Sequence, residues 1–301
     1  MSLLVTGSIA LDTLETPAGR AENVLGGSAI YFALAASQFA PVRVVAAVGE
    51  DFDRGLLCCF DGKCVDTLGI EFRKGSKSFR WHGRYAGTMN EAQTVAVDLN
   101  VLAEKNAPIP PGFRDSRFVF LANTHPRLQR ELAAQLPQAQ LIVCDTMNLW
   151  IENEPAELRR TIACVHGLVL NEAEARQLTG KSNLVTAGRE LLKLGPRFVV
   201  IKKGEHGSIL ISQDDLCIMP AYPTEKVVDP TGCGDSFAGA MMGYLAAQGR
   251  WDAPTLRAAI ARGTVVASHV IESFSVEAAA KLTRADVDRR LGELSRLARF
   301  E

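Results

Sequence analysis

The chain has 301 residues, of which 47% are hydrophobic and 22% are charged, with no biased tract. This composition is that of a globular protein with a large core, and it excludes a disordered or fibrous chain. The 33 basic and 34 acidic side chains leave a formal net charge of −1. No basic run is present that could follow a phosphate backbone, so no nucleic acid partner is expected.

Membrane and secreted locations are not expected either. No stretch approaches the roughly 18 to 20 unbroken apolar residues that a membrane span needs. The apolar segment 1–9 lacks a basic leader and a cleavage-site pattern, so we expect a cytoplasmic protein. The seven cysteines form no C-x-x-C pair and have mostly apolar neighbours. They are typical of free thiols rather than of a metal or redox site.

Short apolar runs of strand length recur along the chain, and segments with helical spacing separate them. The apolar runs lie at 3–5, 42–48, 118–121, 141–143, 167–170 and 198–201, and the helical segments lie at 29–39, 127–136, 155–165, 172–178 and 187–194. This alternation predicts an α/β fold with a doubly wound, mostly parallel sheet and helices on both faces. Beyond residue 235 the pattern is helical, at 236–248, 255–271 and 284–300.

One stretch breaks this alternation. Between residues 70 and 100, aromatic and β-branched residues alternate and glycines punctuate them, which is typical of antiparallel hairpins. We expect a small β lid beside a ligand cleft, contributed by about 11–25 and 66–100. An ordinary edge hairpin is the alternative. The chain 1–301 is then a single domain, and its lid offers a surface for a homodimer.

A glycine-rich turn, Asp229-Pro230-Thr231-Gly232-Cys233-Gly234-Asp235, precedes the first of the C-terminal helices. Its glycines leave peptide N–H groups exposed at a helix N-terminus, where the helix dipole favours a phosphate. Gly232, Cys233 and Gly234 are therefore the candidate anion hole. A carboxylate repels phosphate there unless it takes a proton, so Asp235 is a candidate general base for phosphoryl transfer. A helix cap is the alternative role for the aspartates.

This turn has neither the Lys-Ser/Thr ending of a P-loop nor the G-x-G-x-x-G spacing of a dinucleotide site. It resembles the second signature of the ribokinase, or PfkB-type carbohydrate kinase, family, in which D-x-T-G-A-G-D is followed by small residues. Cys233 stands where that family has alanine. The resemblance covers nearly the whole chain and implies a ribokinase-like kinase that uses ATP and Mg²⁺, with Asp235 as the base and Thr231 in the ATP site. It also implies a monovalent cation such as K⁺ near the Asp229 loop.

The same resemblance implies where the acceptor binds. Asp12 follows the first strand, where the family has an aspartate that holds substrate hydroxyls. Gly26 and Gly27 open a helix where the family's glycine pair lets a sugar approach the backbone, although a plain turn is the alternative. Tyr31 stands four residues after the second glycine, where the sugar kinases have asparagine. A ring with one hydroxyl thus replaces an amide, and the acceptor pocket is partly rebuilt.

Two later motifs match the family's nucleotide site. Asn171 and Glu174 fit an N-x-x-E motif associated with Mg²⁺ and phosphate, and their spacing at a helix start places both side chains on one side. A helix cap is the alternative. The turn after 198–201 resembles the family's turn along the ATP phosphates. A lysine in such a turn can reach a phosphate as a point charge, and a charged hairpin turn is the alternative. Its candidates are Lys203, Gly204, Glu205 and Gly207, and the choice between Lys202 and Lys203 stays open.

Asn123 and Asn148 follow two predicted strands at their carboxyl ends, the edge at which open α/β sheets bind ligands, and are further substrate candidates. We therefore expect a kinase that transfers the γ-phosphate of ATP to a hydroxyl of a sugar or sugar-like small molecule. A nucleoside kinase of the same family is the first alternative. A catalytically silent regulator that binds a nucleotide or a sugar is the second.

Overall fold

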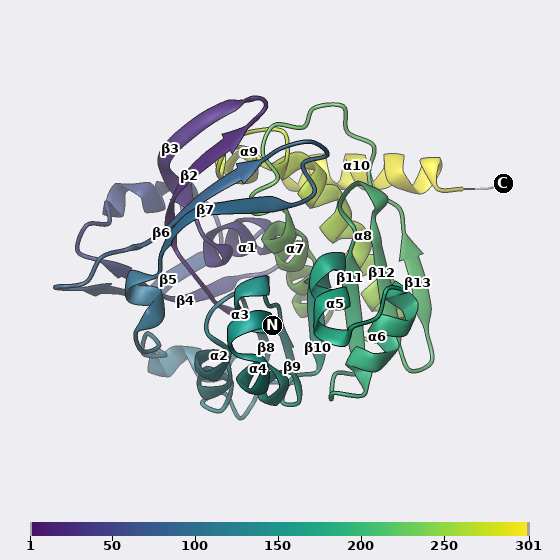
Figure 1. Ribbon diagram of the computed structural model, residues 1–301, viewed down its shortest axis with the longest axis horizontal. Coiled ribbons are helices and arrows are strands. Elements are labelled where there is room, and N and C mark those ends of the chain that lie inside the picture. The colour runs from purple at the N-terminus through teal and green to yellow at the C-terminus, as the bar shows by residue number, and fades with distance from the viewer. Residues whose placement is uncertain (1, 300–301) are drawn as a thin grey trace.

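The computed structural model describes residues 2–299 and contains a large and a small sheet (Figure 1). The strands of the large sheet are β1 (Leu3–Thr6), β4 (Val42–Gly49), β5 (Val65–Arg73), β8 (Phe118–Leu121), β9 (Leu141–Cys144), β10 (Gly167–Asn171), β11 (Phe198–Lys202), β12 (Ser208–Ser212) and β13 (Leu216–Met219). Across the described residues these nine strands have the order β13-β12-β11-β10-β9-β8-β1-β4-β5. All pairs from β5 to β11 are parallel, and β12 and β13 add an antiparallel edge.

Helices cover both faces of the large sheet, so the predicted doubly wound fold is confirmed. One face carries α1 (Ser28–Ala36), α7 (Cys233–Gln248), α8 (Ala253–Val270), α9 (Glu277–Lys281) and α10 (Arg284–Leu297). The other carries α2 (Pro126–Ala133), α3 (Asn148–Asn153), α4 (Pro155–Ile162), α5 (Glu172–Thr179) and α6 (Leu184–Leu192). Successive residues of β1, β4 and β8 to β12 alternate between the two cores; Val5 packs toward α7, and Leu4 packs toward the opposite face.

The first C-terminal helix, α7, is buried along most of its length, as its small residues predict. A Cβ on Gly239 would lie 2.3 Å from the carbonyl oxygen of Phe32, and one on Gly243 would lie 2.6 Å from that of Ala36. Glycine therefore lets the backbones of α7 and α1 touch. The last predicted helix was expected to reach Phe300; α10 ends at Leu297, and positions 1, 300 and 301 lie outside the described residues.

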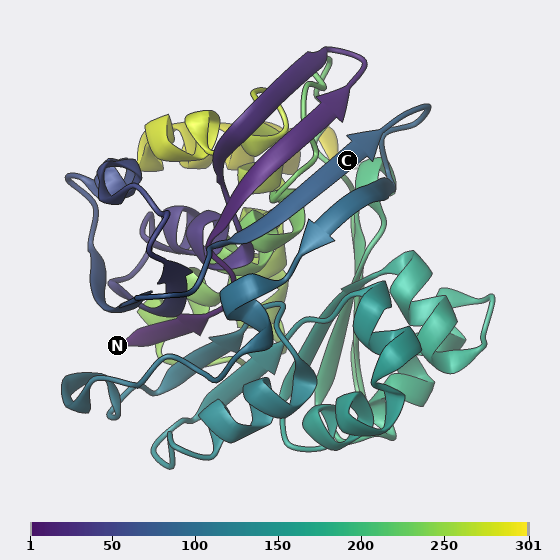
Figure 2. The ribbon, with the colours of Figure 1, turned by 60° about the vertical axis from the view of Figure 1, so that its left-hand side comes forward.

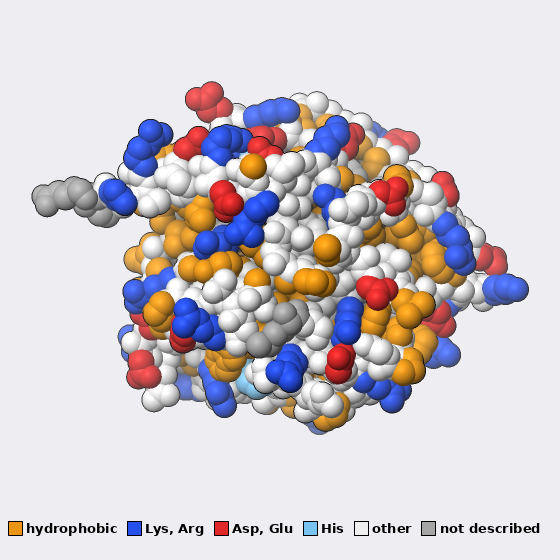
Figure 3. All heavy atoms as spheres, turned by 180° about the vertical axis from the view of Figure 1, so that it is seen from behind, with side chains coloured by type: hydrophobic (Ala, Val, Ile, Leu, Met, Phe, Trp, Pro, Cys, Tyr) orange, Lys and Arg blue, Asp and Glu red, His pale blue; other side chains and the backbone are white. Residues whose placement is uncertain are grey.

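The short 3₁₀ helices are η1 (Arg54–Phe60), η2 (Asn100–Ala103), η3 (Pro111–Phe113) and η4 (Gly204–His206). Within residues 2–299 we find no helix whose length and apolar character would let it cross a membrane. On the face seen in Figure 3, basic and acidic side chains are interspersed rather than gathered by sign. This mixture agrees with the near-zero net charge of the sequence.

The small sheet projects from the body of the protein (Figure 2). It consists of β2 (Ala10–Thr16), β3 (Gly19–Gly26), β6 (Phe79–Tyr85) and β7 (Ala92–Asp98), in the order β3-β2-β6-β7. Two antiparallel hairpins meet through a parallel pair, β2 and β6. The expected lid segment 66–100 was wrong at its start, because 66–73 lies in β5 and pairs with β4 of the large sheet. Alternating residues predict a strand, but they do not show which sheet it joins.

The two sheets are connected through the segment after β4. The N–H of Gly49 donates to Ser78 Oγ (3.0 Å), and the N–H of Ser78 donates to Asp51 Oδ1 (2.7 Å). Arg80 of β6 also contacts Asp51, at 3.1 Å. A Cβ on Gly49 would lie 2.3 Å from the carbonyl carbon of Lys77, so the chain passes too closely for any side chain there. This segment therefore fixes the base of the small sheet.

Candidate active site

The glycine-rich turn leads into α7, and its conformation requires glycine at one position. Gly232 caps the helix with φ 73° and ψ −1°, a left-handed conformation that other residues adopt only at a cost. A Cβ on Gly232 would also lie 2.3 Å from the ring of Tyr31. The N–H of Cys233 already donates to the carbonyl of Pro230 (3.1 Å). The N–H groups of Gly232 and Gly234 are therefore the candidate anion donors of the turn.

The side chains of the turn that face inward hold it to its surroundings. Asp229 is buried, and its two oxygens accept the N–H groups of Thr231 (2.9 Å) and Ser275 (3.1 Å). The thiol of Cys233 lies 3.6 Å from the carbonyl of Ala267 in α8, and burial raises the pKa of that thiol. The substitution of alanine by Cys233 thus adds a contact between α7 and α8 and keeps the backbone of the turn.

Asp235, in the first turn of α7, has a carboxyl whose pKa is raised by burial, while the amine of Lys202 opposes that rise. Asp145 follows β9 and is buried, and its Oδ1 has no hydrogen-bond partner within the described part of the chain. Burial, and next the charge of Asp235, raise the pKa of Asp145. Buried carboxylates near one another are a recurrent feature of sites that handle protons.

The amine of Lys202 lies at this turn. It ends β11, and a Cβ on Gly234 would lie 2.6 Å from its Nζ. Lys203, the proposed ATP contact, is the next residue; of the two lysines, Lys202 is the one whose amine lies at the glycine-rich turn. Phe198 and Val200 of β11 pack toward α7, and the two-residue alternation of a strand extends that face to Lys202.

Asn171 and Glu174 form a reciprocal cap at the start of α5. The N–H of Glu174 donates to Asn171 Oδ1 (2.8 Å), and the N–H of Asn171 donates to Glu174 Oε2 (2.7 Å). The alternative role given by the sequence, a helix cap, is thus present. Glu174 is buried, and burial raises its pKa to about 6, against the opposing charge of Lys202. The motif therefore lies beside the same lysine as Asp145 and Asp235.

The turn after β11 lies under the tip of the small sheet. Asn90, between β6 and β7, donates through Nδ2 to Glu205 Oε1 at 2.9 Å. A Cβ on Gly204, whose φ is 53°, would lie 2.2 Å from Asn90 Oδ1. At the glycine-rich turn, the hydroxyl groups of Tyr85 and Thr231 are 3.4 Å apart. The small sheet thus contacts both turns that the sequence assigned to nucleotide binding.

The predicted acceptor residues are brought together where the small sheet meets α1. Asp12 of β2 lies against Gly26, where a Cβ would be 1.9 Å from Asp12 Oδ2, and Gly27 begins α1 with φ 98°. Burial raises the pKa of Asp12 well above its ordinary value, and Asp229 and Asp235 raise it further. In the described residues Asp12 Oδ1 has no hydrogen-bond partner.

Tyr31 is buried to 1% exposure, and its ring lies under Gly232 rather than on an open pocket wall. Its hydroxyl has no hydrogen-bond partner among residues 2–299. Burial raises the pKa of this phenol well above its ordinary value, and the charges of Asp229 and Asp12 raise it further. Tyr31 is therefore a neutral donor near two carboxylates and a support for the anion turn.

Trp81, which the sequence argument left out of the site, lies beside Asp12. The two residues are register partners in the parallel pair β2–β6, so their side chains share one face of the small sheet. The indole lies over Gly83, where a Cβ would be 2.0 Å from a ring carbon, and it is partly exposed. Its Nε1 donates to Thr94 Oγ1 (3.2 Å), and Tyr85 packs edge-on at 6.5 Å between ring centroids.

Comparison with known families matches this chain to the model of the pfkB family carbohydrate kinases over residues 4–282. The chain belongs to the pfkB family. It is an ATP-dependent kinase that phosphorylates a hydroxyl group of a sugar or a nucleoside.

This PfkB kinase is similar in sequence or in structure to the following three proteins. A cytidine kinase of Thermococcus kodakarensis is 30% identical over 258 residues, which are 83% of this chain and 89% of that protein. The aminoimidazole riboside kinase of Salmonella enterica superimposes with a TM-score of 0.78 at 19% identity, covering 97% of this chain and 100% of that one. A nucleoside kinase of Burkholderia thailandensis gives 0.75 at 21%, covering 97% and 98%. The two structures show that the PfkB fold is shared.

The two asparagines predicted from strand ends have different surroundings in this PfkB kinase. Asn123 accepts the indole N–H of Trp150 at 2.8 Å, and its amide nitrogen lies 2.9 Å from the sulfur of Met147. These contacts hold α3 against the end of β8. Asn148, the first residue of α3, is exposed. The Asn123 amide is thus engaged within the protein, which strand-end position alone does not reveal.

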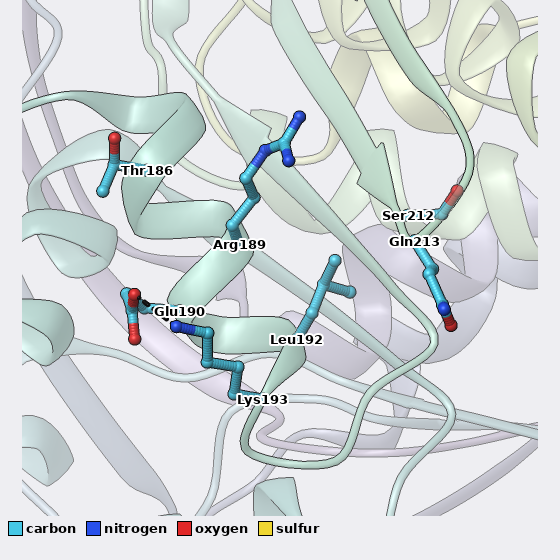
Figure 4. Close-up of a pocket in the computed structure, with 7 residues that line it drawn as sticks. All are labelled: Thr186, Arg189, Glu190, Leu192, Lys193, Ser212 and Gln213. Atoms are coloured by element: carbon cyan, nitrogen blue, oxygen red, sulfur yellow. Dashed lines mark hydrogen bonds and ion pairs between the residues drawn. The ribbon is translucent and has the colours of Figure 1, made fainter.

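A surface hollow of about 410 Å³ lies away from the PfkB site (Figure 4). It is formed by α6 and the end of β12, with Arg189 and the Glu190–Lys193 ion pair on its wall. Ser212, at this hollow, pairs with Phe198 at the amino end of β11. The hollow is therefore at the opposite edge of the sheet from Lys202 and the glycine-rich turn.

Proposed function

We propose that this kinase phosphorylates a nucleoside, at a hydroxyl that faces Asp235. The observation that carries this proposal is the indole of Trp81 beside the buried carboxylate of Asp12. Asp12 Oδ1 can accept a ribose hydroxyl, and a partly exposed indole on the same face can stack with a base. Stacking of a base on an aromatic side chain contributes about 1–3 kcal/mol in single-stranded nucleic acid complexes, and the same physics applies to a nucleoside.

Two further observations support a nucleoside. The cytidine kinase of Thermococcus kodakarensis aligns over most of both chains. Tyr31 replaces the asparagine of the sugar kinases, and it lies under Gly232 instead of presenting an amide to a sugar. A free pentose or hexose is the second candidate, since Asp12 and Gly26 are arranged for hydroxyl groups whatever the sugar carries. The presence of the proposed base, Asp235, argues against a catalytically silent regulator.

In the proposed reaction Asp235 takes the proton of the acceptor hydroxyl, whose oxygen then attacks the γ-phosphorus of ATP. The bond from that phosphorus to the bridging oxygen breaks, and ADP leaves. Gly232, Cys233 and Gly234 form the turn that surrounds the transferred group, and the helix dipole of α7 favours its charge. Gly204, Gly207 and Thr231 carry the adjoining phosphates. Catalysis then consists mainly of positioning and charge stabilisation.

Asn171 and Glu174 are proposed to organise Mg²⁺ that arrives with ATP. One oxygen of Glu174 is used in the reciprocal cap, which leaves its other oxygen for metal-bound water. Within the described chain no three His, Cys, Asp or Glu side chains converge on a metal site. This donor set fits Mg²⁺, which keeps several waters and binds through one or two carboxylates and the phosphates. When bound, Mg²⁺ neutralises charge on the phosphates.

A monovalent cation is proposed at the Asp229 loop. Each Asp229 oxygen accepts one N–H group and keeps lone pairs, and burial raises the pKa of this carboxyl. A buried carboxylate of this kind fits K⁺. Replacement of K⁺ by tetramethylammonium in the assay tests this proposal; unchanged turnover contradicts it.

Two general properties are proposed as well. The seven cysteines of the described chain are free thiols, which suits a reducing cytoplasm. Strand β7 is exposed along its length and carries Val95 and Val97, so a homodimer through the small sheet is proposed. Light scattering coupled to size exclusion tests it: Val97→Lys is expected to shift a dimer to a monomer, and a wild-type monomer contradicts it.

A panel of acceptors with Mg·ATP tests the proposed function. Ribonucleosides, deoxyribonucleosides, pentoses and hexoses are incubated with the purified protein, ADP release is coupled to NADH oxidation, and ³¹P NMR identifies the phosphate ester. We expect turnover of nucleosides at much lower concentrations than of free sugars. If free sugars are phosphorylated and nucleosides are not, the acceptor is a free sugar and the nucleoside proposal is wrong. Turnover of no acceptor, with ATP still bound, would favour the silent regulator.

A further inference from the structure

We infer that Gln129 is a positioning residue of this kinase, which holds Asp145 in place near the proposed base Asp235. This role rests on the proposed function of Asp235, and Gln129 lies outside every motif of the sequence. Gln129 belongs to α2, and 1% of its surface is exposed. Its Nε2 donates to the carbonyl groups of Leu121 (2.9 Å), Ala122 (3.2 Å) and Asp145 (3.3 Å). One buried amide therefore joins the carboxyl ends of β8 and β9.

Gln129 acts at the point where the ladder between β8 and β9 ends. The last register pair is Leu121 with Cys144, and Asp145 is the next residue after β9. The N–H of Asp145 still donates to the carbonyl of Leu121, at 3.3 Å. Buried carbonyl groups need donors, and the two hydrogens of an amide nitrogen are shared here among three of them. Beyond the last bond of the sheet, a side chain therefore fixes the backbone of Asp145.

Asp145 needs this support because its carboxyl group lies among charged groups from three elements. These groups are Asp235 of α7, Lys202 of β11 and Glu174 of α5. Coulomb energy varies inversely with separation, so a shift of about 1 Å at about 5 Å changes it by about a fifth. Asp145 is buried, and its Oδ1 has no hydrogen-bond partner among residues 2–299. The carboxyl group therefore keeps its place only if its backbone is held.

The support for Asp145 is itself anchored. The carbonyl of the first residue of α2 accepts the hydroxyl of Thr161, a buried residue of α4, at 2.7 Å. A second amide, that of Asn123, lies 2.9 Å from the sulfur of Met147, two residues after Asp145. The segment after β9 is thus held at two points by neutral amides. An amide suits position 129 because it supplies donors without a charge that would offset the charge of Asp145.

A double-mutant cycle tests this role with whichever acceptor the panel identifies. Gln129→Met, Asp145→Asn and the double variant are compared with wild type, since methionine has a similar volume to glutamine and lacks its donors. Asn106→Leu is the matched control. Asn106 donates to the carbonyl of Leu128 in α2 at 2.9 Å, so this variant removes a bond to the same helix and leaves the bonds of Gln129 in place. The measured quantities are kcat, KM for ATP and KM for the acceptor, and circular dichroism reports on folding.

For Gln129→Met we expect kcat to fall about 10- to 100-fold, because a small misplacement near the reacting groups has effects of this size. KM for ATP should change less than about twofold. In the Asp145→Asn background, Gln129→Met should lower kcat less than about threefold, since the carboxylate through which it acts is already absent. Asn106→Leu should leave kcat within about twofold of wild type. Gln129→Asn keeps a shorter amide and should have an intermediate kcat; it takes the place of Gln129→Met in the cycle if methionine prevents folding.

Equal falls of kcat in the wild-type and Asp145→Asn backgrounds would overturn the inference, because Gln129 would then act by a route that excludes Asp145. A fall of the same size in Asn106→Leu would also overturn it, since loosening of α2 would be the cause. A kcat of Gln129→Met equal to that of wild type would do the same.

The outcome for Gln129 is separate from the proposed function. If only free sugars are phosphorylated, the nucleoside proposal fails and the cycle is measured with the sugar. If Asp235→Asn keeps the turnover of wild type, the proposed base is wrong, whereas the cycle still shows whether Gln129 acts through Asp145.

Discussion

The large sheet and the small sheet differ in how they hold their functional groups. Asp145 and Lys202 lie at the ends of strands whose residues are buried by helices on both faces. Asp12 and Trp81 lie in a sheet whose outer strand, β7, is exposed along its length. We therefore expect the groups proposed for phosphoryl transfer to be rigidly placed, and the groups proposed for the acceptor to lie on a more loosely supported element.

The contacts between the two regions support this view. Beyond its base at Asp51, the small sheet reaches the nucleotide turns through side-chain contacts, Asn90 with Glu205 and Tyr85 with Thr231. Single hydrogen bonds of this kind contribute about 0.5–1.5 kcal/mol each. Changes in the large sheet should therefore affect turnover of every acceptor, and changes in the small sheet should affect the choice among acceptors.

The largest expected effect is that of Asp235→Asn. Removal of a general base is expected to lower kcat about 10²- to 10⁴-fold for every acceptor, while ATP binding is retained because the amide keeps the shape of the turn. Steady-state kinetics and calorimetry measure the two quantities. Turnover close to that of wild type would remove Asp235 from the role of base.

The acidic limb of the pH profile of kcat/KM should reflect the pKa of the Asp235 carboxyl. As the proposed base, Asp235 must be ionised. Burial raises its pKa above the ordinary value of 3.8, so activity should be lost as the pH falls through that raised pKa. Below it, kcat/KM should fall about tenfold per pH unit. Because the amine of Lys202 lowers the pKa of Asp235, the acidic limb of Lys202→Met should lie at higher pH.

The titratable groups that face Asp235 from other elements are Lys202, Asp145, Asp12 and Glu174. Asp145→Asn removes a negative charge near Asp235 and should move the acidic limb toward lower pH, opposite to Lys202→Met. Limbs that coincide in all three proteins would show that another group controls this part of the profile.

A smaller effect is expected from Trp81→Ala in the small sheet. Loss of a stacking surface should raise KM for a nucleoside about 5- to 100-fold and leave KM for ATP unchanged. Trp81→Phe keeps a ring and should restore much of the affinity. Gln93→Ala, on the same exposed strand β7, is the matched control. An equal rise in KM for free ribose would mean that the indole does not recognise the base.

The smallest effect is expected from the contacts at the sheet boundary. Tyr85→Phe removes the hydroxyl that lies 3.4 Å from Thr231 Oγ1, and Asn90→Ala removes the contact with Glu205. Each should change KM or kcat about two- to tenfold. When two acceptors compete, the ratio of their phosphorylated products should change more than the turnover of either acceptor alone. If both variants lower kcat by orders of magnitude, the small sheet is part of the catalytic framework and the contrast drawn above is wrong.

Much of the fold could be predicted from the sequence because buried parallel strands are uninterrupted apolar runs. Strands β12 and β13 were not predicted. In β13, Leu216 and Ile218 are exposed and alternate with the partly buried Cys217 and Met219, whereas β12 is buried and its short apolar run 209–211 was missed. Segment 66–73 was placed in the wrong sheet because alternation does not identify the neighbouring strand. The short helices α3 and α9 have too few residues to show a period.

The glycine positions of the candidate site could be predicted from the sequence, because the backbone conformation requires glycine there. Gly26, Gly27 and Gly232 are required by close approach or by a positive φ; Gly26 lies beside Asp12, and Gly232 lies over the ring of Tyr31. Side-chain direction was harder to predict. Lys202 and Lys203 are equivalent by motif, and only the packing of β11 distinguishes them. Trp81 became a candidate only through its register with Asp12.

Gly83 is a position at which a single substitution would alter the small sheet. The indole of Trp81 lies so close to Gly83 that a single added methyl group would displace it, since a Cβ there would be 2.0 Å from the ring. A substitution at Gly83 would thus displace the ring on which the proposed nucleoside base stacks. Gly83 belongs to β6 and not to the large sheet. A lineage with this architecture could therefore change its acceptor while its phosphoryl-transfer groups are inherited intact.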